Sequence, residues 1–234
     1  MKVKTILTLM AIMVAYTAFG QKFIPAFDTF SGKKVAYVTL EDGTQVQGTI
    51  KDLDRKKGQI ESIKLRTGDG KKVEYAAEEI KHMYLPPSGF DKFAKTLDFM
   101  NDATQWGDDI DAEVIQKGYA YIEKTEVTYK KKTRVLLMQL VNPSFTGKMR
   151  VYTDPYARET ASIGVAGLTV AGGDEKSYFI KKDNNPAFKL EKKAYKESFK
   201  IIFEECPELL KKVGKKPDWL QFAEHVAEYN QCTK

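Results

Sequence analysis

The stretch VAYVTLEDGTQVQGTI, residues 35–50, carries the pattern that decides the fold. Valine and tyrosine at positions 35–38 favour an extended strand, and Asp42-Gly43 is typical of a tight β-hairpin turn. After that turn, apolar or small residues at positions 46, 48 and 50 alternate with polar residues. Since successive side chains of a strand point to opposite faces, the alternation indicates a second strand with one buried face.

Three further strands are expected before residue 86. Their apolar residues are Ile63 and Leu65, then Val73 and Tyr75, then Met83 and Leu85. Five short strands in about fifty residues, with Gly48 inside the second, favour a strongly bent small barrel. The segment resembles SH3-like and Sm-like barrels, and we expect the barrel to occupy residues 21–87. Some barrels of this shape bind RNA, but the resemblance implies the shape alone.

The rest of the chain predicts helices on either side of a second sheet. Residues 88–118 predict a helical connector, because Phe90, Phe93 and Leu97 recur at helical spacing. Residues 119–190 predict an antiparallel sheet, and residues 191–234 predict helices. The expected fold class is therefore α+β: a small N-terminal SH3-like β-barrel, a central antiparallel β-sheet and a C-terminal α-helical hairpin.

The N-terminus has the composition of a secretory signal peptide. Lys2 and Lys4 precede an almost uncharged apolar run, and the small residues Ala18 and Gly20 follow it. We expect residues 1–20 to be a signal peptide, and the mature chain to be periplasmic or secreted. The alternative is a membrane anchor, but the run of about 15 residues is shorter than the roughly 20 that span a bilayer. We expect no transmembrane segment in the mature chain.

Cys206 and Cys232 are the two cysteines of the chain. In an exported protein an even number of cysteines indicates a disulfide. Apolar residues recur at helical spacing on both sides of Gly214, so two short helices joined there should lie antiparallel and bring the two sulfurs together. The alternative is a metal site, but the histidines are limited to His82 and His225 and no metal-binding spacing is present. We expect no metal and no other cofactor.

A glycine-rich stretch, TASIGVAGLTVAGGDEKSYF at residues 160–179, raises the question of phosphate binding. Gly167 and Gly172 have the separation of a Walker-type loop, but Gly173 stands where that loop requires lysine. Strand-forming residues follow at 177–180, where a phosphate site needs a helix N-terminus. The stretch therefore predicts a turn between two strands.

The strand expected before that turn has small side chains at Gly164, Ala166 and Gly167. A strand position without a large side chain lets another group approach the backbone closely. We expect either a neighbouring helix or a ligand to lie there.

The chain contains 38 lysines and arginines and 32 aspartates and glutamates, which gives a formal net charge of +6. The two signs are interspersed, so the composition does not indicate a nucleic-acid partner. The densest basic run is Lys130, Lys131, Lys132 and Arg134. It favours a solvated hairpin tip, and the alternative is a polyanion-binding patch.

Sequence motifs for catalysis are missing. There is no GxSxG nucleophile motif, and the acidic group that includes Asp109, Asp111 and Glu113 lacks the glycine and glutamate of a calcium loop. Carboxylates favour the N-terminus of a helix, so this group indicates a helix start. Two carboxylates brought together by the fold would still permit hydrolysis of glycans or peptides.

The signal peptide, the block VYTDPYARETASIGVAGLTVAGGDEKSYF at residues 151–179 and the ending FEECPELL…YNQC resemble exported proteins common in Bacteroidetes-type bacteria. The resemblance implies export and brings no activity with it. We expect an exported, non-catalytic binding protein whose partner is an unknown protein or a component of the cell envelope. The alternative is a carboxylate-dependent hydrolase acting on glycans or peptides.

Overall fold

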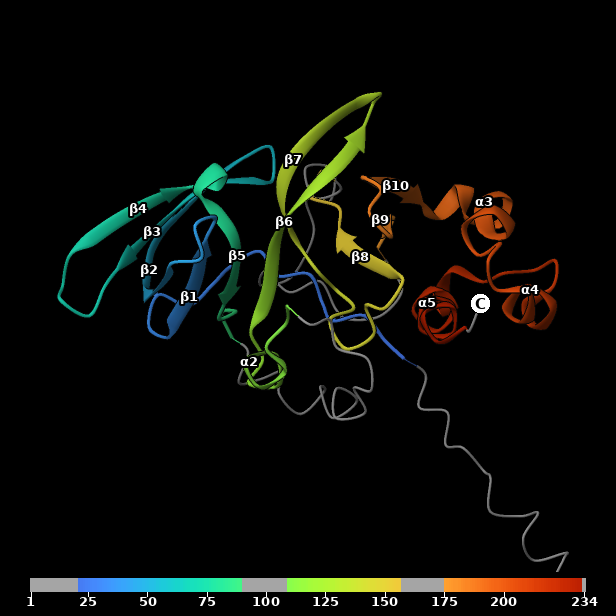
Figure 1. Cartoon of the computed structure of the whole chain (residues 1–234), viewed down its shortest axis with the longest axis horizontal. Helices are drawn as coiled ribbons and strands as arrows, with labels where there is room; N and C mark the ends of the chain where they lie inside the picture. Colours follow the sequence, from blue (N-terminus) through green and yellow to red (C-terminus); the bar gives the residue numbers. More distant parts are fainter. Residues whose placement is uncertain (1–20, 90–108, 157–174, 233–234) are drawn as a thin grey trace, which may run out of the picture.

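The computed structural model describes residues 21–89, 109–156 and 175–232 (Figure 1). The strands are β1 (Val35–Leu40), β2 (Gln45–Lys56), β3 (Gln59–Arg66), β4 (Lys72–Ala76), β5 (Ile80–Leu85), β6 (Ala120–Tyr129), β7 (Lys132–Gln139), β8 (Met149–Thr153), β9 (Ser177–Lys182) and β10 (Ala187–Glu191). The α-helices are α2 (Ala112–Gln116), α3 (Tyr195–Ile202), α4 (Pro207–Val213) and α5 (Phe222–Gln231). Short 3-10 turns are η1 (Ala77–Glu79), η7 (Lys192–Ala194) and η8 (Trp219–Gln221).

All ten of these strands join one sheet. Its order is β4-β3-β2-β1-β5-β6-β10-β9-β8, and β7 pairs with β6 beside this path. The strand pairs are antiparallel except for β6 and β10, which run parallel. The protein is therefore a mixed α+β structure with a large, mostly antiparallel sheet and few helices, as the sequence predicts at that level.

The predicted SH3-like barrel is wrong, because the sheet is open. The hairpin expected at Asp42-Gly43 does form, with Val38 opposite Val46 and Gly43 at a φ of 86°. However, β5 pairs with β1 on one edge and with β6 on the other. Both edges of β5 are thus occupied, and within the described residues β4 pairs with β3 alone. The sheet continues past β5 into the second half of the chain instead of closing.

Strand β6 links the two halves of the sheet. Its residues 122–129 pair with β7 along one edge. Along the opposite edge it pairs first with β5, at residues 120–123, and then with β10, at Val127 and Thr128. In Figure 1, β6 and β7 accordingly stand between β1–β5 and the β8–β10 strands with their helices.

The sheet has two separate hydrophobic cores, and β6 contributes to both. One core lies within β1–β5 and includes Ile63, Leu65 and Met83, with Ile122 of β6. The other lies between β6–β10 and the helices, and it includes Tyr121 of β6. Because Tyr121 and Ile122 are neighbours in a strand, they point to opposite faces and serve opposite cores.

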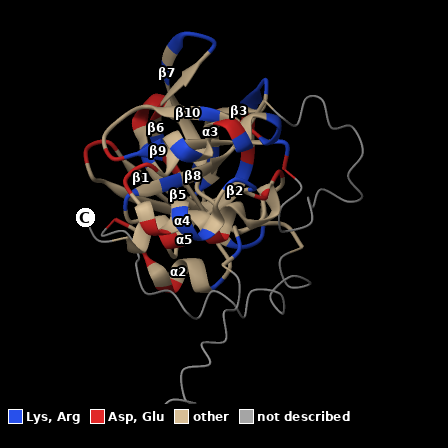
Figure 2. Cartoon of the chain, turned by 90° about the vertical axis from the view of Figure 1, so that its right-hand side faces the viewer, with Lys and Arg blue, Asp and Glu red and all other residues tan. Residues whose placement is uncertain are grey.

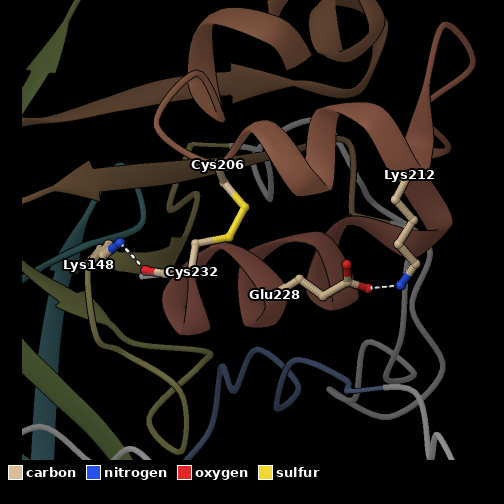
Figure 3. Close-up of a disulfide and its surroundings, with 5 residues drawn as sticks. All are labelled: Lys148, Cys206, Lys212, Glu228 and Cys232. Atoms are coloured by element: carbon tan, nitrogen blue, oxygen red, sulfur yellow. Dashed lines mark hydrogen bonds and ion pairs between the residues drawn. A yellow bond between two sulfur atoms is a disulfide. The ribbon is translucent and has the colours of Figure 1, made fainter. Parts of the chain in front are cut away.

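The chain ends in helices that pack on the second core. Phe199 of α3, Leu209 of α4 and Phe222 of α5 are buried there. Cys206, at the N-terminal end of α4, is bonded to Cys232, at the C-terminal end of α5 (Figure 3). The disulfide predicted from the sequence is therefore confirmed.

Several predictions fall on residues outside the described ranges. These are the signal peptide, most of the helical connector, the glycine turn at 172–174, and the strand that carries Gly164, Ala166 and Gly167. The strand expected directly after the glycine turn is β9. Among the described helices, none has the length and apolar character needed to cross a bilayer.

Replacing Gly48 with alanine is expected to lower the free energy of unfolding by about 1–3 kcal/mol. An added Cβ would lie 2.5 Å from the carbonyl oxygen of Arg66, so β2 and β3 would have to move apart. Urea unfolding monitored by circular dichroism measures the loss. Gly68→Ala is the matched control, because a Cβ there meets nothing within 4 Å. Equal losses for the two variants would contradict this explanation.

Reducing the disulfide is expected to lower the free energy of unfolding by about 3 kcal/mol, the chain-entropy value for joining residues this far apart. Cys206 and Cys232 are separated by 26 residues. The measurement is urea unfolding with and without dithiothreitol. The Cys206→Ala/Cys232→Ala variant is the control, and its stability should not respond to the reductant. An oxidised protein no more stable than the reduced one would refute the expectation.

Candidate functional site

A groove of about 830 Å³ lies over β1, β2 and β5, where residues 109–114 approach them. Tyr37, Gln47, His82 and Tyr84 are among the side chains that line it. Aromatic faces with a few polar groups are the usual lining of a binding site. The groove is therefore the candidate functional site.

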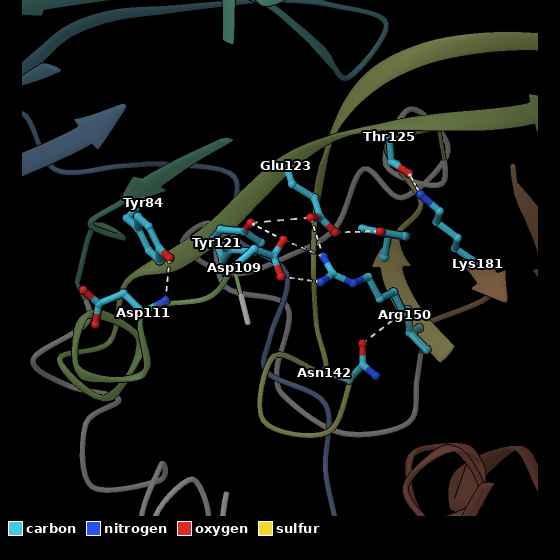
Figure 4. Close-up of polar contacts among 11 residues, drawn as sticks. Tyr84, Asp109, Asp111, Tyr121, Glu123, Thr125, Asn142, Arg150 and Lys181 are labelled. Atoms are coloured by element: carbon cyan, nitrogen blue, oxygen red, sulfur yellow. Dashed lines mark hydrogen bonds and ion pairs between the residues drawn. The ribbon is translucent and has the colours of Figure 1, made fainter. Parts of the chain in front are cut away.

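A buried row of polar side chains lies on the β6 face that meets the second core. Tyr121, Glu123 and Thr125 occupy alternate positions of the strand, so they share one face. Glu123 is only 7% exposed. Its carboxylate accepts hydrogen bonds from the Tyr152 hydroxyl at 2.6 Å and from the Arg150 guanidinium at 2.5 Å (Figure 4). The buried charge is thus compensated by partners from β8.

Arg150 connects this buried carboxylate to the groove. Its guanidinium also donates a hydrogen bond to Asp109, which lines the groove, at 2.6 Å. Burial works against the charged form of Arg150, but Glu123 and Asp109 outweigh it and raise the pKa of the guanidinium. Burial also works against the charged form of Asp109, and the hydrogen bonds and charge of Arg150 reverse this and lower the pKa of that carboxyl. The Arg150–Asp109 pair is therefore ionised at neutral pH.

His82 and Tyr84 form an aromatic wall of the groove. The His82 ring lies 5.8 Å from the ring of Tyr84 and 5.5 Å from that of Tyr121. Desolvation, together with the charge of Lys81, lowers the pKa of His82, so the imidazole is neutral at pH 7. Burial raises the pKa of Tyr84 to about 12, and its hydroxyl accepts a hydrogen bond from the backbone N–H of Asp111 at 2.7 Å. Neither ring carries a charge at neutral pH.

Two acidic side chains at the site, Asp109 and Glu123, share one cationic partner. Carboxylate-dependent hydrolysis of glycans needs one carboxyl group that donates a proton and a second that is ionised. Asp109 and Glu123 instead accept hydrogen bonds from the same guanidinium. A proton on either carboxyl group would cost one of these charge-assisted hydrogen bonds. Arg150 is therefore the shared partner of both carboxylates.

The sequence identified only part of this site. Asp111 is the N-cap of α2 and accepts a hydrogen bond from the backbone N–H of Val114, which confirms the predicted helix start. Asp109, from the same acidic group, instead pairs with Arg150. Sequence analysis missed the cluster of Asp109, Glu123 and Arg150. The one available signal was a glutamate on the same strand face as Tyr121.

The basic run Lys130, Lys131, Lys132 and Arg134 lies away from the groove, at the turn between β6 and β7. Tyr129 pairs with Lys132 across this turn, which confirms the predicted hairpin tip. Its role as a polyanion-binding patch remains a prediction.

Neither histidine belongs to a metal centre within the part of the chain that the structure describes, where no cluster of three His, Cys, Asp or Glu side chains could hold an ion. His225 lies in the second core, where its Nδ1 is 2.6 Å from the Tyr195 hydroxyl. Desolvation lowers the pKa of His225. It therefore packs as a neutral, hydrogen-bonded ring.

Replacing Arg150 with methionine is expected to lower the free energy of unfolding by about 2 kcal/mol at pH 7, since two carboxylates lose their partner. The loss is smaller than for a fully buried pair because the Asp109 side chain is 45% exposed. The pKa of Asp109 is lowered in the folded state, so the stabilisation is present above its unfolded pKa of about 4 and disappears as pH falls through the folded value. Urea unfolding of both proteins between pH 7 and pH 3 measures this difference.

The control for this variant is Lys71→Met, which removes an exposed ion pair with Asp69. Its expected effect is below about 1 kcal/mol at every pH. A loss in Arg150→Met that stays constant as the pH falls would contradict the ionic explanation.

Comparison with family models, with curated proteins and with solved structures found no match for this chain. Its function has therefore to be inferred from the groove, the charges and the disulfide themselves.

Proposed function

We propose that the protein is an exported, non-catalytic binding protein of the bacterial periplasm or cell envelope. The observation that carries this proposal is the groove over β1, β2 and β5. Its described lining combines the rings of Tyr37, His82 and Tyr84 with polar and aliphatic side chains. Its two carboxylates, Asp109 and Asp111, already accept hydrogen bonds from Arg150 and from the backbone N–H of Val114. Such a surface offers stacking faces and hydrogen bonds without a free acid–base pair.

Exposed residues of the groove support binding of a partner. Tyr37 is a large aromatic side chain that is 39% exposed, and its ring is 5.8 Å from the ring of Tyr119. The Tyr119 hydroxyl in turn donates a hydrogen bond to the backbone carbonyl of Val35 at 2.9 Å. A tyrosine held against a fixed neighbour loses little conformational entropy on binding, which is why tyrosine is common in binding sites.

The disulfide supports the proposed compartment. Cys206 and Cys232 are bonded, and such bonds persist mainly in oxidising compartments. Together with the signal-peptide pattern of residues 1–20, this favours export. The hydrolase alternative requires Asp109 or Glu123 to act as a proton donor, and nothing in their hydrogen bonding favours that role.

Export predicts a mature protein that begins at Gln21 and carries no free thiol. Intact-mass analysis of the protein purified from the producing cells, with and without an alkylating reagent, measures both properties. We expect loss of residues 1–20 and no alkylation of Cys206 or Cys232 until the protein is reduced. An intracellular form that keeps Met1 and alkylates without reduction would overturn the proposed compartment.

Binding through the groove predicts that the Tyr37→Ala/Gln47→Ala variant has a lower affinity for isolated cell envelopes, measured by co-sedimentation. We expect the affinity to fall about five- to tenfold relative to the wild type, because truncating a central aromatic contact costs more than about 1 kcal/mol of binding free energy. Ile201→Ala is the control, because Ile201 is 70% exposed on α3 and does not line the groove. Unchanged sedimentation of the groove variant would contradict the proposal. So would turnover of glycan or peptide substrates that Glu123→Gln abolishes without unfolding the protein.

A further inference from the structure

Basic residues from separate segments gather around Tyr156, away from the groove. Figure 2 shows lysines and arginines at the tip of the β7 hairpin and beside the β3 and β10 labels. The turn between β2 and β3, which carries Lys57, packs on Pro155, because a Cβ at Gly58 would overlap the Pro155 carbonyl oxygen. Next to that turn, the Gln59 side chain donates a hydrogen bond to the Tyr156 hydroxyl. The β2–β3 turn therefore lies beside Tyr156.

The β6–β7 turn also lies beside Tyr156. The ring of Tyr129, at the end of β6, stacks on Tyr156 with 4.6 Å between centroids and 14° between planes. Burial raises the pKa of Tyr156, and the positive charge of Arg134 opposes that rise, which places Arg134 near its hydroxyl. Two tyrosine rings thus lie among lysines and an arginine.

A cavity of about 530 Å³ adjoins this stacked pair. Its other described walls include Lys176, Lys189, Lys192 and Lys193. Lys189 has a structural role, because it pairs at 2.7 Å with the fully buried carboxylate of Asp154. Lys193 pairs with Glu191 at 2.8 Å.

Lys176 and Lys192 differ from these two lysines. Both are exposed, and no carboxylate among the described residues forms an ion pair with either. The backbone N–H of Lys192 donates to the carbonyl of Lys176 at 2.9 Å, so the two residues are neighbours in space. Both residues also line the cavity, so the positive charges of both would attract an anionic ligand bound there.

The β6–β7 turn keeps its lysines in an unfavourable backbone conformation. Lys130 and Lys131 have φ values of 47° and 63°, which is the left-handed region. The central positions of such a two-residue turn strongly prefer Asn-Gly. Two lysines there cost conformational free energy, and residues held in such conformations cluster at functional sites.

We propose that this basic face, formed by Lys57, the Lys130–Arg134 turn, Lys176 and Lys192, binds an acidic polysaccharide that carries carboxylate or sulfate groups. The ammonium groups pair with the anionic substituents along the chain. The Tyr129–Tyr156 pair offers aromatic surface to the apolar C–H face of a sugar ring. The site is distinct from the groove and does not require it.

The ligand class follows from charge complementarity and from the disulfide. A basic surface with tyrosines would also suit single-stranded nucleic acid. A protein with a disulfide works where oxidised cysteines persist, and the polyanions met there are mainly glycans. This choice between polyanions rests on the proposed export, whereas the location of the site does not.

The test is equilibrium binding of heparin to the disulfide-bonded protein, measured by titration calorimetry over a range of salt concentrations. We expect the Lys176→Gln/Lys192→Gln variant to bind heparin about three- to tenfold more weakly at physiological salt. The slope of log K against log salt should fall by about two, because two fewer counterions are displaced. Tyr156→Leu, which keeps an apolar side chain, should weaken binding at unchanged slope.

The matched control is Lys33→Gln/Lys72→Gln, which removes two exposed lysines at the β1–β4 end of the sheet. It has the same net charge as the Lys176/Lys192 variant and should bind heparin as the wild type does. Equal weakening by the two double variants would refute the site. Tighter binding of oligo(dT) than of heparin would refute the glycan. Retention of Met1 with free thiols refutes export, and the comparison of the two double variants still decides where polyanions bind.

Discussion

The first four residues of strand β6, residues 120–123, are buried on both faces of the strand, and the rest of the structure depends on that constraint. Ile122 packs into the core within β1–β5, while Tyr121 and Val127 pack into the core beneath the helices. A shift of its register by one residue would exchange the two sets of side chains between the faces. Pairing with β7 on one edge, and with β5 and β10 on the other, opposes such a shift. The positions of both halves of the sheet are therefore set by one strand.

The same strand accounts for the open sheet. A barrel made from the first five strands would need a free edge on β5, but His82–Leu85 pair with β6 at that edge. The burial of residues 120–123 of β6 also affects the wall of the groove. Glu123 shares a strand face with Tyr121, so its charge lies inside the protein and requires Arg150 as a partner. Because Arg150 also pairs with Asp109, the internal charge and the groove wall are stabilised together.

Features with local signals were predictable from the sequence, and features that depend on distant strands were not. Asp42-Gly43 specifies its hairpin, and Asp111 caps its helix, through contacts within a few residues. The two cysteines could be paired because the helices between them were recognisable. Glu123 and Arg150 are 27 residues apart, and they meet only because β8 and β6 lie in one folded sheet. Neither the residue types nor their spacing predicts such a pair without the strand order.

The disulfide and the groove are joined by a continuous set of contacts. Two residues before Cys232, the side-chain oxygen of Asn230 accepts hydrogen bonds from the backbone N–H groups of Lys148 and Met149 at 2.8 and 2.7 Å. These bonds fix the start of β8, and Arg150 follows at its next position. The disulfide restrains the end of α5, and hence Asn230, against fraying. The disulfide thus stabilises the position from which Arg150 reaches Glu123 and Asp109.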